Sequence, residues 1–264
     1  MPAETHMMKD RIVLVTGGAS GIGRATSMSL AAEGAIVVIA DRNGDMAANT
    51  AAEINEGKGR ATSASVDVTD AGAVGTLIED IVREHGRLDG AFNNAGIEGP
   101  SAKVLDLSTQ DWEEVIRVNL SGIFNCMKVE VAQMTQQDEG GSIVNTASIA
   151  GLVGLPYASA YVAAKHGVVG LTKAAALDYA RDNVRVNAVC PGFVDTPMLS
   201  RGALRDRGDG NTNNRVRDRL LSSIPQRRLA SPDEVADAVV WMLSTRASYM
   251  TGVALPLDGG WVAQ

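Results

Sequence analysis

The sequence predicts an α/β fold of the doubly wound type, in which helices cover both faces of a parallel seven-stranded sheet. From Arg11 onward, short runs of β-branched residues alternate with longer amphipathic stretches. The short runs are almost continuously apolar, as expected for strands that crossover helices bury on both faces. The expected strands are Ile12–Val15, Ala35–Ala40, Thr62–Val68, Leu88–Asn93, Ser142–Thr146, Val184–Val189 and Val253–Leu257.

The longer stretches between these strands have the spacing of helices. The clearest start signal belongs to the last of them, where Ser231, Pro232 and Glu234 supply the N-cap serine, N1 proline and N3 glutamate of a capping box. Ser108 and Asp111 give a weaker version of the same signal. The expected helices are Gly21–Glu33, Met46–Glu56, Ala71–His85, Trp112–Gln136, Ser159–Arg181 and Pro232–Leu243.

The chain contains no internal repeat and no linker between domains. We therefore expect residues 1–10 to be a flexible N-terminal segment and residues 11–264 to form one domain. The segment Ser200–Asn214 is rich in Arg, Gly, Asp and Asn and has almost no apolar residues. Its composition fits either a mobile loop near a functional site, which would make it a substrate lid, or plain surface.

The composition indicates a small-molecule ligand. The 264 residues carry a net charge of -7, which argues against nucleic acid because phosphate binding needs a basic face. Cys126 and Cys190 lie far apart and the histidines lack zinc-binding spacing, so we expect neither disulfides nor a metal. Neither a signal peptide nor a run of ~20 apolar residues is present, so the sequence predicts a cytoplasmic protein without membrane contact.

The turn after the first strand has the composition of a phosphate-binding loop. Gly17, Gly21 and Gly23 stand where the first strand hands over to the first helix. Glycines allow a tight turn and a close approach of the ligand, and the helix N-terminus offers free N–H groups to a pyrophosphate. Asp41 follows at the end of the second strand, as in dinucleotide sites. The sequence therefore predicts a Rossmann-type domain that binds a dinucleotide.

Asp41 also bears on the choice between NAD and NADP. A carboxylate at this position can accept hydrogen bonds from the ribose hydroxyls of NAD and would repel the 2′-phosphate of NADP. The neighbouring Arg42 has the opposite effect, because a guanidinium can pair with a phosphate. We expect NAD, with NADP as the less favoured cofactor.

Further motifs follow in the order and spacing of the short-chain dehydrogenase/reductase family, which the chain resembles from about Arg11 to Trp261. Tyr-x-x-x-Lys alone is common by chance, but the whole set is specific. The resemblance implies hydride transfer between a nicotinamide cofactor and an alcohol or ketone. The shared motifs are Thr16-Gly17-x-x-x-Gly21-x-Gly23, Asn93-Asn94-Ala95-Gly96, Asn119, Ser148, Tyr161-x-x-x-Lys165 and Pro191-Gly192.

The physical chemistry of Tyr161 and Lys165 agrees with this resemblance. The two residues are one helical turn apart, so their side chains face the same way. A phenol with a pKa near 10 is a poor base at neutral pH. An ammonium ~5 Å away at an effective dielectric of ~20 would favour the phenolate by about 3 kcal/mol and lower the pKa by about two. We therefore expect Tyr161 to approach the range of a general base.

The resemblance implies further roles. Tyr161 would exchange a proton with the substrate, Lys165 would hold the nicotinamide ribose, and Ser148, at the carboxyl edge of the sheet, would hold the substrate oxygen. Asn119 resembles the helix asparagine that holds a water in the family's proton relay. The expected catalytic set is thus Asn119, Ser148, Tyr161 and Lys165.

Cofactor contacts are expected at the carboxyl ends of several strands. Asp67 and Val68 resemble the adenine contact, Asn94 to Gly96 line the turn beside the adenosine ribose, and Pro191 to Thr196 embrace the nicotinamide amide. The full expected set is Gly17, Ser20, Gly21, Ile22, Gly23, Asp41, Arg42, Asp67, Val68, Asn94, Ala95, Gly96, Tyr161, Lys165, Pro191, Gly192, Val194 and Thr196.

Other functions fit the sequence less well. A serine hydrolase would need a G-x-S-x-G elbow, which neither Ser20 nor Ser148 provides. A dinucleotide sensor without turnover would usually lack the tyrosine or the lysine. Enoyl reductases usually space these two residues differently. An NADP-dependent reductase resembling the 3-oxoacyl carrier-protein reductases is the closest alternative, although Asp41 counts against it.

Fold does not determine substrate. The motifs around Ser148 and Tyr161 resemble those of bacterial family members that oxidise secondary, often cyclic, alcohols. Apolar residues that line a substrate pocket or pack the core are Ile149, Leu152, Val153, Leu155, Phe193, Met198 and Leu199. Family members are commonly tetramers joined through long helices and the C-terminal strand, and the Leu255–Gly260 segment matches that strand, so the resemblance implies a homotetramer.

Overall fold

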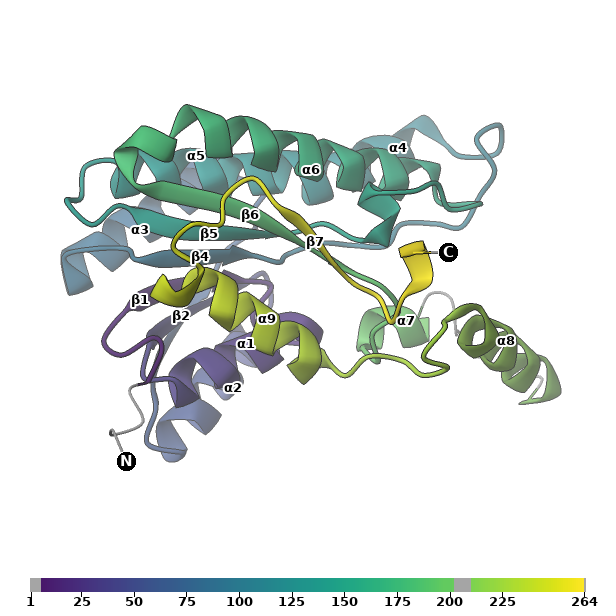
Figure 1. Cartoon of the computed structure of the whole chain (residues 1–264), viewed down its shortest axis with the longest axis horizontal. Coiled ribbons are helices and arrows are strands. Elements are labelled where there is room, and N and C mark those ends of the chain that lie inside the picture. Colours follow the sequence, from purple (N-terminus) through teal and green to yellow (C-terminus); the bar gives the residue numbers. More distant parts are fainter. Residues whose placement is uncertain (1–5, 202–209, 264) are drawn as a thin grey trace.

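The strands form one parallel sheet, as the sequence predicts (Figure 1). The computed structural model describes residues 6–201 and 210–263. Within them, seven strands are hydrogen-bonded in the order β3-β2-β1-β4-β5-β6-β7. The order reverses between β1 and β4, which is the switch point where such sheets bind ligands at their carboxyl edge. The strands are β1 (Ile12–Thr16), β2 (Ile36–Asp41), β3 (Arg60–Ser65), β4 (Gly90–Asn93), β5 (Gly141–Thr146), β6 (Val184–Pro191) and β7 (Ala254–Leu257).

Helices cover both faces of this sheet (Figure 1). One face is covered by α1 (Gly21–Ala32), α2 (Gly44–Glu56) and α9 (Pro232–Leu243). The other face is covered by α3 (Ala71–His85), α4 (Thr109–Ile116), α5 (Gly122–Met134) and α6 (Ser159–Asp178). The remaining helices, α7 (Pro197–Arg201) and α8 (Gly210–Ser223), lie beyond the carboxyl end of β6. None of the helices in the described ranges is long and apolar enough to cross a membrane.

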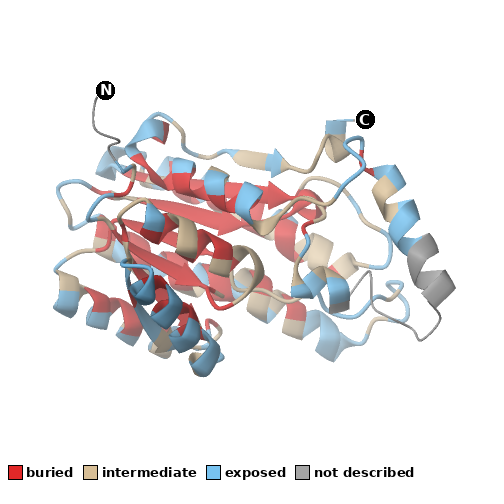
Figure 2. Ribbon diagram, turned by 90° about the horizontal axis from the view of Figure 1, so that it is seen from below, coloured by how far each residue is buried: buried red, intermediate tan, exposed pale blue. Residues whose placement is uncertain are grey.

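The core is divided between the two faces of the sheet. Every residue of β1 is buried. Val13 and Val15 pack with Leu30 and Val239 on the α1–α9 side, whereas Leu14 packs among the apolar residues of α3 and α5. The strands form the buried centre in Figure 2, with exposed residues on the outer sides of the helices. This two-sided burial explains why β1 is apolar throughout rather than alternating.

The expected elements agree with the structure to within three residues at each end, but one strand is shifted along the chain and one helix is interrupted. The third strand is Arg60–Ser65 rather than Thr62–Val68, because β3 is an edge strand with mostly exposed residues and no apolar run marks its ends. The expected helix Trp112–Gln136 begins earlier, where Ser108 caps the N–H of Asp111 at 3.0 Å. It is also interrupted by the π-helical turn Arg117–Ser121, which separates α4 from α5.

Parts of the two segments expected to be irregular are ordered. The N–H of Met7 donates to Glu33 at 2.8 Å and Met8 is buried, so residues 6–10 pack against the end of α1. Residues 1–5 lie outside the described residues, as do residues 202–209 of the Ser200–Asn214 segment. Residues 210–214, expected to be loop or surface, form the first turns of α8. Their Gly and Asn residues have low helix propensity, so local composition did not reveal this helix.

Candidate active site

The glycine-rich turn and the Asn94 turn are bound to each other. The backbone N–H groups of Asn94 and Ala95 donate to the hydroxyl of Thr16 at 3.0 and 3.3 Å. The Asn94 amide donates to the carbonyls of Thr16 and Gly17 at 3.3 and 3.1 Å. Gly17 has a positive φ of 61°, and a Cβ there would lie 2.9 Å from the Cα of Ala95. The sequence therefore needs glycine at this crossing, and the two predicted cofactor turns meet at one edge.

The N-terminus of α1 has no side-chain cap among the described residues. Ser20 occupies the N-cap position, but within the described structure its side chain makes no capping hydrogen bond. The first N–H groups of a helix have no intrahelical partner, so those of Gly21, Ile22 and Gly23 face the turn. Thr196 approaches from the β6 side, 3.3 Å from where a Cβ of Gly21 would lie. By contrast, the capped helices α2, α3, α4 and α9 use Asn43, Asp70, Ser108 and Ser231.

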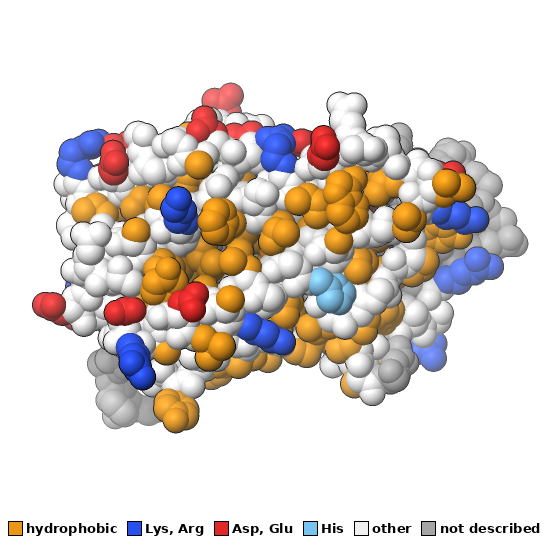
Figure 3. Space-filling model, turned by 90° about the horizontal axis from the view of Figure 1, so that it is seen from above, with side chains coloured by type: hydrophobic (Ala, Val, Ile, Leu, Met, Phe, Trp, Pro, Cys, Tyr) orange, Lys and Arg blue, Asp and Glu red, His pale blue; other side chains and the backbone are white. Residues whose placement is uncertain are grey.

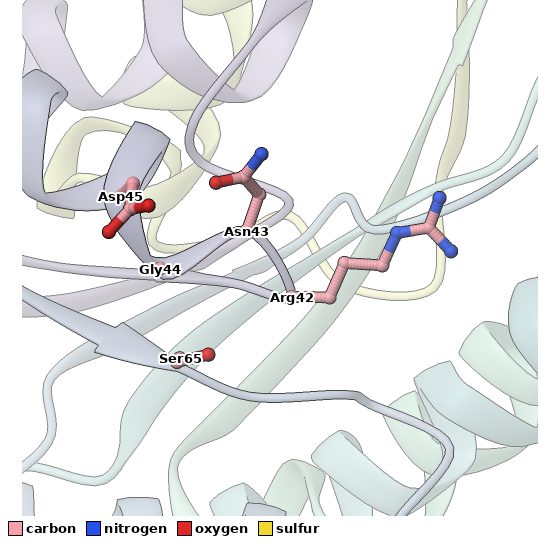
Figure 4. Close-up of a pocket in the computed structure, with 5 residues that line it drawn as sticks. All are labelled: Arg42, Asn43, Gly44, Asp45 and Ser65. Carbon is pink, nitrogen blue, oxygen red and sulfur yellow. The ribbon is translucent and has the colours of Figure 1, made fainter.

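The end of β2 carries an acidic residue, Asp41, followed directly by a basic one, Arg42. The carboxylate of Asp41 accepts hydrogen bonds from the N–H groups of Ala19 at 3.3 Å and Asn43 at 2.9 Å. The residues that follow Asp41 help to line an open pocket of about 610 Å³. Figure 4 shows the Arg42 side chain extending away from α2, whereas Asp45 lies in the first turn of that helix. The pocket is lined by Arg42, Asn43, Gly44, Asp45 and Ser65.

Asp67 and Val68 lie in the turn after β3 rather than at the end of the strand itself. The N–H of Thr69 donates to Asp67 at 2.9 Å, and this bond is the main reason that the pKa of Asp67 is lowered. Val68 is buried, and its carbonyl accepts a hydrogen bond from Asn125 at 3.0 Å. Both expected adenine contacts are thus held at the same carboxyl edge as Asp41.

Ser148, Tyr161 and Lys165 meet beyond the ends of β5 and β6. Tyr161 and Lys165 are on α6, and the ammonium of Lys165 lies 5.5 Å from the centroid of the Tyr161 ring. Lys165 donates to the carbonyl of Thr146 at 2.7 Å. The hydroxyl of Ser148 lies close enough to Tyr161 to lower the pKa of the phenol, and it also donates to the carbonyl of Pro191 at 3.5 Å. The geometry expected from the helical spacing is present.

The expected lowering of the pKa of Tyr161 is not observed. Burial raises the pKa of Tyr161 to about 12, although the hydrogen bond from Ser148 acts in the opposite direction. Burial also lowers the pKa of Lys165 to about 8. The spacing of Tyr161 and Lys165 accounts only for the attraction between their charged forms, whereas burial of both groups favours their neutral forms more strongly.

Asn119 holds the loop that follows β4. Its amide oxygen accepts from the N–H of Ile97 at 2.8 Å, and its amide nitrogen donates to the carbonyl of Ile97 at 2.7 Å. A Cβ on Gly96 would lie 2.9 Å from the Asn119 oxygen and 3.8 Å from the ammonium of Lys165. Asn119 is fully buried within the π-helical turn. Its side chain therefore binds the backbone of Ile97 in both directions.

The Pro191–Thr196 segment is fixed from both sides. The N–H of Gly192 donates to the carbonyl of Leu257 on β7 at 2.9 Å. Val194 is buried and pairs with Ala230 through an isolated bridge. The hydroxyl of Thr196 donates to the carbonyl of Val194 at 3.4 Å. This segment therefore presents a rigid backbone beside Ser148 and the start of α1.

The apolar residues near the site divide into core and rim. Ile149 is 2% exposed and is a core residue. Phe193 packs edge-on against Trp261, with ring centroids 6.2 Å apart. Met198 is exposed. Only part of the expected apolar set can therefore contact a ligand.

Sequence reasoning missed Glu98. Glu98 is exposed, but its carboxyl lies close enough to Tyr161 for its charge to raise the pKa of the phenol, and partial desolvation raises the pKa of Glu98 itself. Its position two residues after the Asn93–Gly96 motif was the available signal. A loop carboxylate is usually solvated, so composition alone gave no reason to select it.

Comparison with known families and proteins agrees with this arrangement. Residues 17–262 match the family described as "Enoyl-(Acyl carrier protein) reductase". A 2,5-dichloro-2,5-cyclohexadiene-1,4-diol dehydrogenase of Sphingobium indicum is 41% identical over 97% of this chain and 98% of its own length. The cyclohexanol dehydrogenase of an Acinetobacter species is 38% identical over 98% of both chains. The 3-oxoacyl-[acyl-carrier-protein] reductase of Thermotoga maritima is 37% identical over 97% and 99%.

Two solved structures have the same fold as this chain. Levodione reductase superimposes with a TM-score of 0.92 at 36% identity, covering 97% of this chain and 99% of that one. NAD+-bound xylitol dehydrogenase gives a TM-score of 0.90 at 36% identity, covering 96% and 99%. The fold and these relatives define a hydride-transfer oxidoreductase that binds a nicotinamide dinucleotide. The chain belongs to the short-chain dehydrogenase/reductase family.

Proposed function

We propose that this protein interconverts a secondary alcohol and its ketone, with Tyr161 as general acid and base. The contact of Tyr161 with both Ser148 and Lys165 is the observation that carries this proposal. It places one exchangeable proton, one hydroxyl that can hold the substrate oxygen, and one cation at a single point of the sheet edge. A hydrolase would need a general base beside a serine nucleophile, and this arrangement supplies a phenol in its place.

The chain's own residues would handle the oxygen and its proton. Ser148 orients the substrate oxygen toward Tyr161, which takes the hydroxyl proton during oxidation and returns it during reduction. Lys165 is fixed by Thr146 and keeps its charge beside the phenol as the proton leaves. Asn119 acts indirectly, because its hold on Ile97 keeps the neighbouring loop in place. A bound nicotinamide supplies the hydride chemistry.

We propose NAD as the preferred cofactor. The free N–H groups at the start of α1 fit a pyrophosphate, and the carboxylate of Asp41 lies where ribose hydroxyls bind in this fold. The similar structure of NAD+-bound xylitol dehydrogenase adds support. Arg42 beside the same pocket, together with the carrier-protein reductase relative, keeps NADP as the alternative.

We propose a cyclic secondary alcohol as the substrate class. Two relatives are named for a cyclohexadiene diol and for cyclohexanol. The partly exposed apolar residues Leu152, Val153 and Leu155 lie between Ser148 and Tyr161 along the chain, where they can contact a ring. Reduction of a 3-oxoacyl chain is the second candidate, favoured by the Thermotoga relative.

We further propose a cytoplasmic homotetramer. Apolar side chains spread over the face of the molecule formed by α4, α5 and α6 (Figure 3). Phe124 and Leu177 on this face are 48% and 82% exposed, more than expected for large apolar residues facing only water. Light scattering tests the assembly.

Cys126 and Cys190 are free and buried, which fits a reducing compartment.

The proposal is tested with a panel of cyclic and open-chain secondary alcohols and ketones, assayed by absorbance of the reduced cofactor. The wild type should turn over at least one member, and NAD should outperform NADP. The variant Tyr161→Phe should lose nearly all turnover while still binding NAD in calorimetry. Full turnover by Tyr161→Phe would refute the role of the phenol. Cofactor binding without turnover of any substrate would favour a dinucleotide sensor.

A further inference from the structure

A fully buried carboxyl group lies behind the reaction site, and the mechanism above does not use it. Glu130 is on α5 and is 0% exposed. Its Oε2 accepts a hydrogen bond from the amide nitrogen of Asn93 at 2.8 Å. Within the part of the chain that the structure describes, Oε1 of Glu130 and Oδ1 of Asn93 have no hydrogen-bond partner. A buried acid and a buried amide therefore each keep one oxygen without a donor.

This contact belongs to a buried row of polar side chains that joins α5, β4, β5 and α6. The amide nitrogen of Asn93 also lies 3.1 Å from the amide oxygen of Asn145. The amide nitrogen of Asn145 lies 3.0 Å from the hydroxyl of Thr172. Asn93 is 1% exposed, and Asn145 and Thr172 are 0% exposed. Because these side chains are removed from bulk solvent, they depend on one another for hydrogen bonds.

The row lies directly behind the residues of the site. Asn93 precedes Asn94, whose amide holds the glycine-rich turn. Asn145 precedes Thr146, whose carbonyl accepts the hydrogen bond of Lys165. The other end of the row is on α6, the helix that carries Tyr161 and Lys165. A displacement within the row would therefore move the cofactor turn and the lysine anchor together.

Among the described residues, no charged side chain packed against Glu130 compensates a negative charge on its carboxyl group. Cys126, one helical turn earlier, is its titratable neighbour on α5. β4 and β5 contribute no charged residue, and Lys165 on α6 is engaged with Thr146. α3 turns Val74, Leu77, Ile78 and Ile81 inward, and its charged residues Glu79, Asp80, Arg83 and Glu84 are exposed. Burial raises the pKa of Glu130 to about 8, because one neutral N–H donor does not offset the loss of water.

We propose that Glu130 is held as a neutral carboxylic acid and acts as a positioning residue, its proton completing the buried row that fixes the ends of β4 and β5 against α6. An amide can turn to exchange its oxygen and nitrogen. With both amides turned, the 2.8 Å contact becomes a carboxyl proton donated to Asn93, and each later contact in the row reverses its direction. Loss of the proton removes this donor and leaves a buried charge, so alignment and stability fall together.

The test compares the wild type with the neutral isostere Glu130→Gln. A folded-state pKa near 8, against 4.5 for the free side chain, means that the fold holds the proton more tightly than the unfolded chain. The wild type should therefore lose melting temperature relative to Glu130→Gln as the pH rises from about 5 to about 8, with a constant difference above. Lys165, whose pKa is lowered to about 8, acts above this range and is present in both proteins. The exposed Glu113→Gln variant is the matched control and should follow the wild type.

Two further readouts separate a positioning role from a merely structural one. Difference infrared spectra of the wild type minus Glu130→Gln should show the carbonyl band of a neutral carboxylic acid at pH 7. Glu130→Gln should keep its kcat near neutral pH, whereas Glu130→Leu should lose about tenfold to a hundredfold in kcat and should also bind NAD more weakly, because the cofactor turn moves with the row. The kcat readout rests on the proposed function, but the melting and infrared readouts do not. Parallel pH profiles of melting, or a carboxylate band alone, would overturn the proposal even if Glu130→Leu does not fold.

Discussion

Lys165 places its ammonium 5.5 Å from the centroid of the Tyr161 ring while donating a 2.7 Å hydrogen bond to the carbonyl of Thr146. The carbonyl, at the end of β5, fixes the nitrogen in a position that helical spacing alone would leave free to rotate. Lys165 is buried and Tyr161 is partly buried, and burial shifts the pKa of each toward its neutral form. The Lys165 ammonium therefore stabilises Tyr161 most when Tyr161 has given up its proton, because the surrounding protein supplies little other compensation for the phenolate charge.

Replacing Lys165 by methionine should lower kcat for alcohol oxidation by about a hundredfold or more, the usual scale for lost support of proton transfer. The variant should also bind NAD more weakly if the ammonium holds the nicotinamide ribose. Lys165→Arg should not restore kcat, because a planar guanidinium cannot reproduce the compact contact with Thr146. Steady-state kinetics and calorimetry measure both effects. Lys173→Met, which removes an exposed lysine of the same helix, is the control; an equal loss there would contradict the specific role.

Glu98→Gln should move the pH profile of oxidation toward lower pH. The Glu98 charge raises the pKa of Tyr161, so its removal lowers that pKa, and the phenolate needed to accept the substrate proton forms at lower pH. The profile of kcat/KM against pH measures the displacement. Asp106→Asn, which removes an exposed acid from the same loop, should leave the profile in place. An unchanged or alkaline-shifted profile in Glu98→Gln would show that the carboxylate does not act on Tyr161.

Asp41→Ala should weaken NAD binding and narrow the preference for NAD over NADP. The carboxylate would otherwise accept from the ribose hydroxyls and repel a 2′-phosphate. Arg42→Ala is the informative partner, because it should reduce NADP binding and leave NAD binding almost unchanged. The ratio of kcat/KM for the two cofactors measures both effects. A constant ratio in Asp41→Ala would assign the preference to other residues.

The fold was predictable where local pattern and burial agree. The first strand is buried on both sides and reads as an unbroken apolar run, and the start of α9 carries the complete capping box of Ser231 and Glu234. The predicted third strand lay too far toward the C-terminus, because an edge strand with mostly exposed residues has no apolar run to mark its ends. The π-helical turn around Asn119 was not predicted, since its residues are those of an ordinary helix and the widening depends on packing against Ile97.

The site was predictable where a backbone position demands a particular residue. Gly17 is required by its positive φ and its approach to Ala95, so the motif records the geometry. Glu98 and Glu130 left no such record, because carboxylates are usually solvated, and the approach of Glu98 to Tyr161 and the burial of Glu130 arise from distant parts of the chain. For the same reason, the predicted direction of the pKa shift of Tyr161 was wrong. Spacing gave the distance to Lys165, but only the folded structure supplies the desolvation that outweighs it.

Two glycine-to-alanine variants should change stability in opposite directions. A Cβ at Gly23 would lie 2.1 Å from the carbonyl oxygen of Gly17, so the turn must shift. We expect Gly23→Ala to lower the free energy of unfolding by about 3 kcal/mol and to weaken NAD binding. A Cβ at Gly75, inside α3, meets no atom within 4 Å among the described residues. Gly75→Ala should raise the free energy of unfolding by about 0.5–1 kcal/mol, since alanine loses less entropy in a helix.

Denaturant titrations at fixed protein concentration measure both changes, and NAD titration separates the turn from the helix. Gly75→Ala should bind NAD like the wild type, because α3 lies away from the glycine-rich turn. Gly23→Ala should show both defects together, since the Gly17 carbonyl that its Cβ displaces also accepts a hydrogen bond from Asn94. Stability loss in Gly23→Ala with NAD affinity intact would mean that this carbonyl moves without disturbing the cofactor turn. That result would separate the packing requirement of the motif from its role in binding.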